Sequence, residues 1–144
     1  MNDVVIIGSG PAGLSAALYI LRAGFSVTVI GKDNGALEKA ESIQNYFGLE
    51  RPMSGHELVE IGKKQVRELG GTILQDEVVG IKWDGDYTVS TVNTEISAKA
   101  IILTTGVHLL IDNNSFIFQP DAQFPCQITS FGSSQRNKQA GGLK

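Results

Sequence analysis

The chain has 144 residues, of which 42% are hydrophobic and 19% charged, and its net charge is −3. This length and composition are typical of one folded domain and argue against intrinsic disorder. Acidic and basic residues are mixed along the sequence, which leaves no basic face for a nucleic acid. No charged leader precedes the first apolar run and no run has the length of a membrane span, so we expect a cytoplasmic protein that binds neither nucleic acid nor membrane.

The first expected element is a strand over residues 4–7, because this run is apolar and β-branched, as in a strand buried on both faces of a parallel sheet. Two glycines end the strand. From Pro11 onward, leucines and alanines recur with helical spacing up to Gly24, which is placed as a C-terminal cap. A second β-branched run over residues 26–30 completes a strand–helix–strand unit, which is almost always parallel and right-handed.

The middle of the chain predicts a loop with a short helix around residues 36–41, and then a longer helix. Ser54 and Glu57 have the spacing of a capping box in front of a helix over residues 55–69, which Gly70 and Gly71 end. The short run that follows, residues 72–74, predicts a third parallel strand.

The next segment has antiparallel character. Residues 78–83 and 87–92 flank an Asp-Gly-Asp turn, which predicts a hairpin, and residues 95–98 predict a third antiparallel strand. Residues 100–103 are again fully apolar and predict a parallel strand. We therefore expect an α/β fold, a Rossmann-like parallel sheet whose last crossover is an antiparallel β-meander.

The organisation predicts one nucleotide-binding domain over residues 1–107 and a divergent tail over residues 108–144. In the tail, residues 115–118 favour one added strand, and the polar remainder is typical of a flexible end. The single cysteine, Cys126, cannot form an internal disulfide or a Cys-x-x-Cys pair. With His56 and His108 as the only histidines, metal-ligand spacing is lacking, and we expect an ordinary free thiol and no metal site.

The glycines at positions 8, 10 and 13 fit a G-x-G-x-x-G phosphate loop between the first strand and the first helix. In that frame Gly8 allows the tight turn, Gly10 lets the backbone approach a pyrophosphate, and Gly13 lets the helix pack on the strand. The helix start at Pro11 offers unpaired N–H groups and a positive dipole end to phosphates. The sequence thus predicts dinucleotide binding; the alternative is a tight turn that binds nothing.

The acidic residue that usually follows the second strand and holds the ribose is missing, because the sequence there is Gly31-Lys32-Asp33. Three alternatives remain open. Asp33 reaches back to the ribose, or the backbone and Lys32 take over the adenosine end, with Lys32 also compatible with a phosphorylated ribose. In the third alternative, Lys32 and Asp33 are simply turn residues.

Four motifs in order, "GSGPAGLSAALYILRAG", "ESIQNYFGL", "DEVVGI" and "AIILTTG", carry a resemblance to a known family. Over roughly residues 1–107 the chain resembles the N-terminal FAD-binding half of thioredoxin-reductase-like flavoproteins. The stretch "IGKDNGALEKAESIQNYFG" is most similar to a clostridial-type branch in which Gly-Lys-Asp likewise replaces the acidic residue.

The resemblance implies FAD as the cofactor and assigns roles to residues at matching positions. Around the pyrophosphate and ribose it places Gly8, Gly10, Pro11, Ala12, Gly13, Gly31, Lys32 and Asp33. Along the rest of the cofactor it places Asn45 toward the isoalloxazine, the backbone of Val78 at the adenine, and Thr104, Thr105 and Gly106 beneath the cofactor.

The chain also departs from the family pattern, since it has no second glycine-rich phosphate loop, no Cys-x-x-Cys and no recognisable Gly-Asp ending. We therefore expect a flavin-dependent oxidoreductase of thioredoxin-reductase-like type, present as a truncated FAD-binding portion that lacks disulfide reductase activity by itself. A homodimer or a partner subunit is expected to complete the flavin site. One alternative is a noncatalytic FAD- or nucleotide-binding module that acts with a partner. Another, a simple NAD(P)-binding Rossmann domain, is disfavoured by the β-meander and the Asn45 motif.

Overall fold

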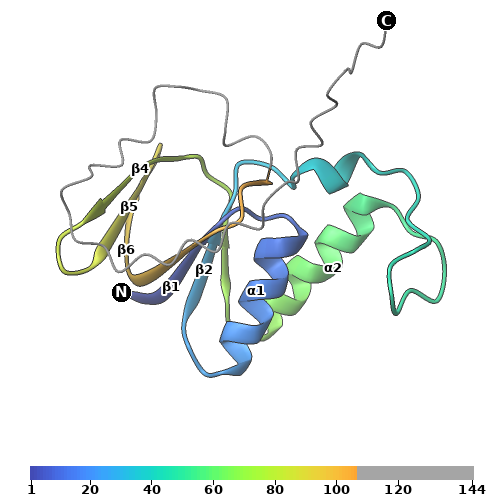
Figure 1. Cartoon of the computed structure of the whole chain (residues 1–144), viewed down its shortest axis with the longest axis horizontal. Coiled ribbons are helices and arrows are strands. Elements are labelled where there is room, and N and C mark those ends of the chain that lie inside the picture. Colours follow the sequence, from blue (N-terminus) through green and yellow to red (C-terminus); the bar gives the residue numbers. More distant parts are fainter. Residues whose placement is uncertain (107–144) are drawn as a thin grey trace, which may run out of the picture.

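The computed structural model describes residues 1–106, which form one six-stranded sheet with two α-helices against one of its faces (Figure 1). The strand order is β3-β2-β1-β6-β5-β4, with β3, β2, β1 and β6 running parallel and β6, β5 and β4 antiparallel. The elements are β1 (Asn2–Ile7), α1 (Pro11–Arg22), β2 (Val27–Ile30), the 3-10 helix η1 (Ala36–Lys39), α2 (Gly55–Glu68), β3 (Thr72–Leu74), β4 (Val78–Trp83), β5 (Tyr87–Thr91) and β6 (Glu95–Leu103). The predicted Rossmann-like α/β fold with a β-meander crossover is confirmed.

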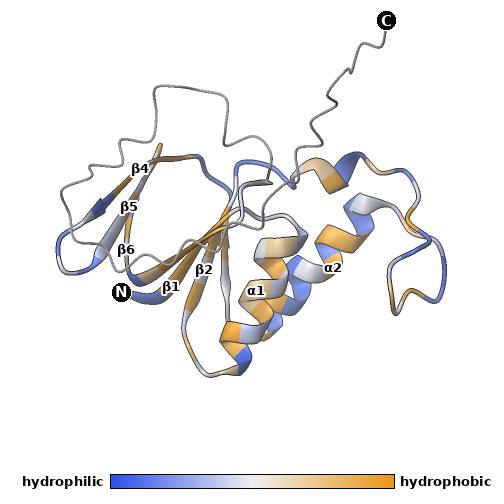
Figure 2. Ribbon diagram, in the orientation of Figure 1, coloured by the Kyte–Doolittle hydropathy of each residue, from blue (hydrophilic) through white to orange (hydrophobic). Residues whose placement is uncertain are grey.

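The central strands are buried on both faces, as their continuous apolar runs predicted. On one face, Ile6 and Val29 pack against the helices, together with Leu14 of α1 and Val59 of α2. On the other face, a second cluster joins Val5, Ile7 and Ile30 of the parallel strands to Val89 and Ala98 of the meander. Figure 2 shows the resulting hydrophobic colouring along β1 and β2 and on parts of α1 and α2.

Both α-helices have the predicted ends. Helix α1 starts at Pro11, and the chain leaves it through Gly24, whose φ of +88° favours glycine. At α2, the Ser54 hydroxyl accepts a hydrogen bond from the Glu57 N–H at 3.1 Å, and the Glu57 carboxylate accepts one from the Ser54 N–H at 2.9 Å. This capping box satisfies two backbone donors that a helix start otherwise leaves unpaired.

The structure differs from the prediction where residues 95–98 and 100–103 were expected to form two strands. They form one strand, β6, whose first part pairs antiparallel with β5 and whose second part pairs parallel with β1. Ala98 takes part in both pairings and is fully buried. Because no Gly or Pro interrupts the segment, the backbone continues straight from one partner to the other. The meander is therefore part of the main sheet.

Several predictions concern residues outside the described part of the chain. The domain boundary at 107, the strand at 115–118 and Cys126 all lie there and stay predictions. Within residues 1–106, neither α-helix combines the length and apolar character that crossing a bilayer requires.

Candidate functional site

A cleft of about 570 Å³ opens at the carboxyl ends of the parallel strands, where ligands bind in open α/β sheets. Its walls are the loops that follow β1, β2, β3 and β6. All the predicted site residues except Gly13 and Asn45 line it: Gly8, Gly10, Pro11, Ala12, Gly31, Lys32, Asp33, Val78, Thr104, Thr105 and Gly106. The structure thus brings together residues that lie nearly a hundred positions apart in the sequence.

The base of the cleft is built by the contact between Gly8 and Thr104. Gly8 has a φ of +120°, and a Cβ there would overlap the carbonyl oxygen of Thr104. The Gly8 N–H donates to the carbonyl oxygen of Ile30 at 2.7 Å. Only glycine combines this conformation with so close an approach, as expected of the first glycine of a phosphate loop.

Gly13 does not line the cleft; its role is to let α1 pack closely against the loop after β1. A Cβ at Gly13 would overlap the Gly8 carbonyl oxygen and lie 2.7 Å from Oγ1 of Thr104. The missing side chain therefore allows α1 to sit directly on the loop that leaves β1. This is the packing role that the third glycine of the motif predicts.

Gly10 lies at the start of α1 and opens into the cleft. Its backbone has φ −77°, and a Cβ would meet no atom within 4 Å. No side chain caps α1, and its first turn carries no acidic residue. The first N–H groups of the helix lack helical partners, and the helix dipole makes this end positive. A helix start with open space in front of it fits a diphosphate.

The Ser9 side chain explains why a glycine, Gly31, stands after β2 in place of the usual acidic residue. A Cβ at Gly31 would overlap Oγ of Ser9 and lie 2.6 Å from the Ser9 Cβ. Ser9 is itself buried, and its hydroxyl donates to the carbonyl oxygen of Asp33 at 2.6 Å. Ser9 therefore occupies the space that a side chain at position 31 needs.

Lys32 and Asp33 both line the cleft and have defined partners. Nζ of Lys32 lies 2.8 Å from Oε2 of Glu77, and hydrogen bonding to this carboxylate raises the pKa of Lys32. Oδ1 of Asp33 accepts a hydrogen bond from the Gly35 N–H at 2.8 Å, which closes a tight turn. The Lys32–Glu77 pair joins the loop after β2 to the loop after β3.

Three residues of this site with polar side chains were missed in the sequence: Ser9, Asp76 and Glu77. Asp76 is only 7% exposed and accepts hydrogen bonds from the Glu77 N–H at 2.8 Å and from Nδ2 of Asn93 at 3.0 Å. Hydrogen bonding from the Thr91 hydroxyl, the Glu77 and Asn93 backbone N–H groups and the Asn93 amide lowers the pKa of Asp76. For the two acidic residues, the available signal was their position just after the parallel strand predicted over residues 72–74.

A polar network holds the loop between β2 and η1 against α2. Nδ2 of Asn34 donates to Oε1 of Glu38 at 2.7 Å, and Nδ1 of His56 lies 3.2 Å from the same oxygen. The Lys63 ammonium donates to the Asn34 side chain and pairs with Glu60 at 2.8 Å. The hydrogen bonds from Asn34 and His56 lower the pKa of Glu38. This network fixes the segment that continues from Asp33 along the cleft.

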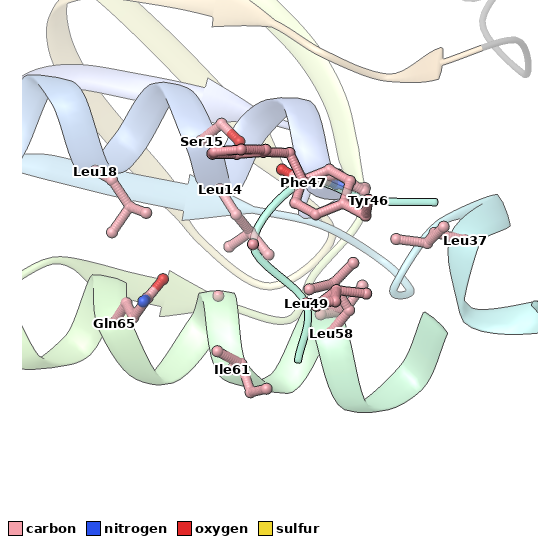
Figure 3. Close-up of a pocket in the computed structure, with 14 residues that line it drawn as sticks. Leu14, Ser15, Leu18, Leu37, Tyr46, Phe47, Leu49, Leu58, Ile61 and Gln65 are labelled. Carbon is pink, nitrogen blue, oxygen red and sulfur yellow. The ribbon is translucent and has the colours of Figure 1, made fainter. Parts of the chain in front are cut away.

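Asn45 is exposed and does not line the cleft, so its predicted contact with the isoalloxazine stays a prediction. The residues after it line a second pocket of about 240 Å³ between α1 and α2. Figure 3 shows Tyr46, Phe47 and Leu49 beside the two helices, with Leu14 on one side and Leu58 on the other. The structure therefore places this motif at the helix pair.

Comparisons with known proteins agree with this geometry. The profile of the pyridine nucleotide-disulphide oxidoreductase family matches residues 2–116. The chain is 36% identical to a thioredoxin reductase from Aquifex aeolicus over 110 residues, covering 72% of this chain and 33% of that protein. It is 39% identical to a thioredoxin reductase from Treponema pallidum over 107 residues, covering 72% of this chain and 35% of that protein.

Among solved structures, the atypical thioredoxin reductase TRi from Desulfovibrio vulgaris Hildenborough is similar, with a TM-score of 0.69 and 40% identity. That match covers 74% of this chain and 36% of the other. The chain thus spans about a third of the length of the relatives it matches. With a matching profile over most of its length and a thioredoxin-reductase-like fold around a glycine-rich loop, the chain belongs to the pyridine nucleotide-disulphide oxidoreductase family.

Proposed function

We propose that the chain binds FAD in the cleft and serves as the FAD-binding part of a thioredoxin-reductase-like flavoenzyme. The observation that carries the proposal is the start of α1 at Gly10, which opens into the cleft at the carboxyl ends of β1, β2 and β6. The identity to thioredoxin reductases supports a flavin cofactor.

In this proposal each wall of the cleft takes one part of the cofactor. The helix start at Gly10 and Ala12 holds the diphosphate, the loop after β2 takes the ribose, and the backbone of Val78 meets the adenine. The Thr104–Thr105–Gly106 segment passes beneath the rest. FAD supplies the electron transfer itself when bound, and the protein supplies its position and electrostatics. Because Cys126 is the only cysteine, we propose that the chain alone does not reduce disulfides.

The test is the ligand that the purified chain carries and prefers. We expect flavin absorption bands after purification or after addition of FAD, with quenching of flavin fluorescence during titration. FMN lacks the adenosine monophosphate part of FAD, and therefore has one phosphate and no adenosine, so it should bind at least about tenfold more weakly if the adenosine and diphosphate sites supply much of the affinity. Equal affinity for FMN and FAD, or binding of NAD⁺ or NADP⁺ in preference to FAD, would contradict the proposal.

The proposal includes a homodimer or a partner subunit that completes the flavin end of the site. Its support is the exposure of Asn45, the residue expected to face the isoalloxazine. Light scattering of the chain with and without saturating FAD tests the homodimer. A mass that doubles with FAD supports a second copy. A monomer that keeps one FAD through dialysis contradicts both the homodimer and the partner subunit.

A further inference from the structure

The adenosine end of the cleft has an acidic side chain, although not at the usual position. Three carboxylates line the cleft, those of Asp33, Asp76 and Glu77. That of Asp76 is buried and already accepts hydrogen bonds from Glu77 and Asn93, which leaves Asp33 and Glu77 as the candidates. We propose that Glu77, positioned by Lys32, accepts the hydrogen bonds of the ribose hydroxyls and selects a dinucleotide whose ribose is not phosphorylated. This inference rests on the proposed function, because it assigns a role within the same cleft.

The first step is that position 31 has no room for an acidic side chain. An acidic side chain there would have to displace Ser9, since a Cβ at Gly31 already overlaps the Ser9 hydroxyl. That hydroxyl is committed to the Asp33 carbonyl oxygen at 2.6 Å and is buried. The ribose therefore needs a hydrogen-bond acceptor from another position.

The second step is the position of Glu77 beside Gly31. The Gly31 N–H donates to the Leu74 carbonyl oxygen at 3.1 Å, and the Asp76 N–H donates to the Gly31 carbonyl oxygen at 3.2 Å. Glu77 is the next residue along the chain. The residue before Glu77 is therefore hydrogen-bonded to Gly31, the position at which the family usually has its carboxylate. The Glu77 side chain starts close to that position.

The third step is the rigidity of that backbone. The Glu77 N–H donates to Oδ1 of Asp76 at 2.8 Å, and the Glu77 carbonyl oxygen accepts from the Val92 N–H at 3.0 Å. Asp76 is in turn held by Asn93. A binding group is most effective when its support is already fixed, and both backbone polar groups of Glu77 are fixed here.

The fourth step distinguishes Glu77 from Asp33. Oδ1 of Asp33 accepts from the Gly35 N–H two residues further on, which directs this carboxylate back toward its own turn, whereas Glu77 reaches across to the loop after β2. The Glu77 carboxylate uses Oε2 for Lys32 at 2.8 Å, and we assign Oε1 to the ribose. The Glu77 side chain is 50% exposed, so a ligand can reach it.

The fifth step is the role of Lys32. Its ammonium holds Glu77 and offsets the negative charge that would otherwise repel a nearby diphosphate. Because Glu77 already neutralises Lys32, a ribose 2′-phosphate would meet a paired lysine and a carboxylate. Lys32 is therefore a positioning residue for Glu77 rather than a phosphate ligand.

The test measures the binding of ADP, 2′-deoxy-ADP and adenosine 2′,5′-bisphosphate to the full chain, by displacement of FAD and by calorimetry. A charged acceptor for the 2′-hydroxyl should make ADP bind about tenfold more tightly than 2′-deoxy-ADP in the wild-type chain. Glu77→Gln should weaken ADP binding several-fold and leave 2′-deoxy-ADP nearly unchanged, so most of the preference disappears, because the amide oxygen that remains is an uncharged and weaker acceptor. Lys32→Met should reduce the preference without reversing it.

The matched control is Glu68→Gln, because Glu68 forms a comparable exposed pair with Lys64 at 3.8 Å on α2, outside the cleft. It should retain the full preference for ADP. Loss of the preference in Asp33→Asn but not in Glu77→Gln would overturn the assignment, as would tighter binding of the 2′-phosphorylated compound than of ADP. If the wild-type chain does not bind FAD, the proposed function fails; if it binds FAD and Glu77→Gln keeps the preference, only this inference fails.

Discussion

The side-chain oxygen of Thr104 lies 3.0 Å from the carbonyl oxygen of Gly8, which ties the end of β6 to the phosphate loop. The same hydroxyl lies 3.1 Å from the carbonyl oxygen of Ile7, and the Thr104 N–H donates to that oxygen at 2.8 Å. Thr104, near the end of the described residues, thus holds the loop that follows β1 near the start of the chain. The shape of the cleft depends on a contact between segments about ninety-six positions apart.

Replacing Thr104 by valine keeps its shape and removes the hydroxyl. We expect Thr104→Val to lower the free energy of unfolding by about 1–3 kcal/mol, because partly buried carbonyl oxygens lose a donor. FAD affinity should fall as well, since Gly8 lines the cleft. Urea unfolding measures the first effect and fluorescence titration the second. Thr72→Val on the exposed side of β3 is the control, and an equal loss of stability in both variants would contradict the role of this hydroxyl.

Two glycines of the phosphate loop should respond differently to substitution. Gly10→Glu should change the free energy of unfolding by less than about 1 kcal/mol, because its Cβ points into open space and its φ is ordinary. It should nevertheless weaken FAD binding by at least about tenfold, because a carboxylate enters the proposed diphosphate site. Gly13→Ala should instead destabilise the fold, since its Cβ would overlap the Gly8 carbonyl oxygen.

The measurement is a pair of curves for each variant, chemical unfolding without ligand and flavin titration. Gly80→Ala is the matched control, because its Cβ would make an ordinary contact 3.9 Å from the Ser90 Cβ on the meander. Tight FAD binding by a folded Gly10→Glu chain would place the cofactor elsewhere.

The parts of the fold that the sequence predicted well are those decided by neighbouring residues. The strand, loop and helix from Asn2 to Arg22 follow from an apolar run, two glycines and a helical period, and the capping box at Ser54 follows from a spacing of three. Each depends on interactions within a few positions. The same is true of the hairpin turn around Gly85, whose φ is +84°.

The parts that were missed depend on contacts between distant segments. Whether residues 95–103 form one strand or two is decided by β1 and β5 on either side of Ala98. Likewise, the reason for Gly31 is the Ser9 side chain, and the position of Glu77 follows from the pairing of β3 with β2. Periodicity carries no information about such neighbours, whereas family resemblance located the cleft residues without explaining them.

The capping box at α2 should contribute measurably to stability. Ser54→Ala removes the acceptor for the Glu57 N–H and should lower the free energy of unfolding by about 1 kcal/mol. Ser54→Asp keeps an acceptor at the helix start and should restore most of the loss. Thermal or urea unfolding of the three chains gives the comparison. If alanine and aspartate behaved alike, the cap would have no energetic role.

The buried carboxylate of Asp76 should make stability depend on pH. Hydrogen bonding, first from the Thr91 hydroxyl and then from the Glu77 and Asn93 groups, lowers the pKa of Asp76 in the folded chain. The unfolded chain therefore binds a proton at a higher pH than the folded chain does. The contribution of Asp76 to stability is present above the ordinary aspartate pKa of about 4 and is lost as the pH falls through the lower folded value.

Asp76→Asn should consequently flatten the acid side of the stability profile while lowering stability at neutral pH. Urea unfolding at several values between about pH 7 and about pH 3 tests this, with Asp84→Asn in the exposed hairpin turn as the control. Within residues 1–106, the other carboxylates with a lowered pKa, those of Asp3, Glu38, Glu57 and Glu60, remain in both variants and keep part of the acid dependence. Because Asp76 also holds the backbone of Glu77, its substitution should weaken the preference for ADP over 2′-deoxy-ADP at neutral pH. An unchanged preference together with a flattened acid profile would separate the stabilising role of Asp76 from any role in positioning Glu77.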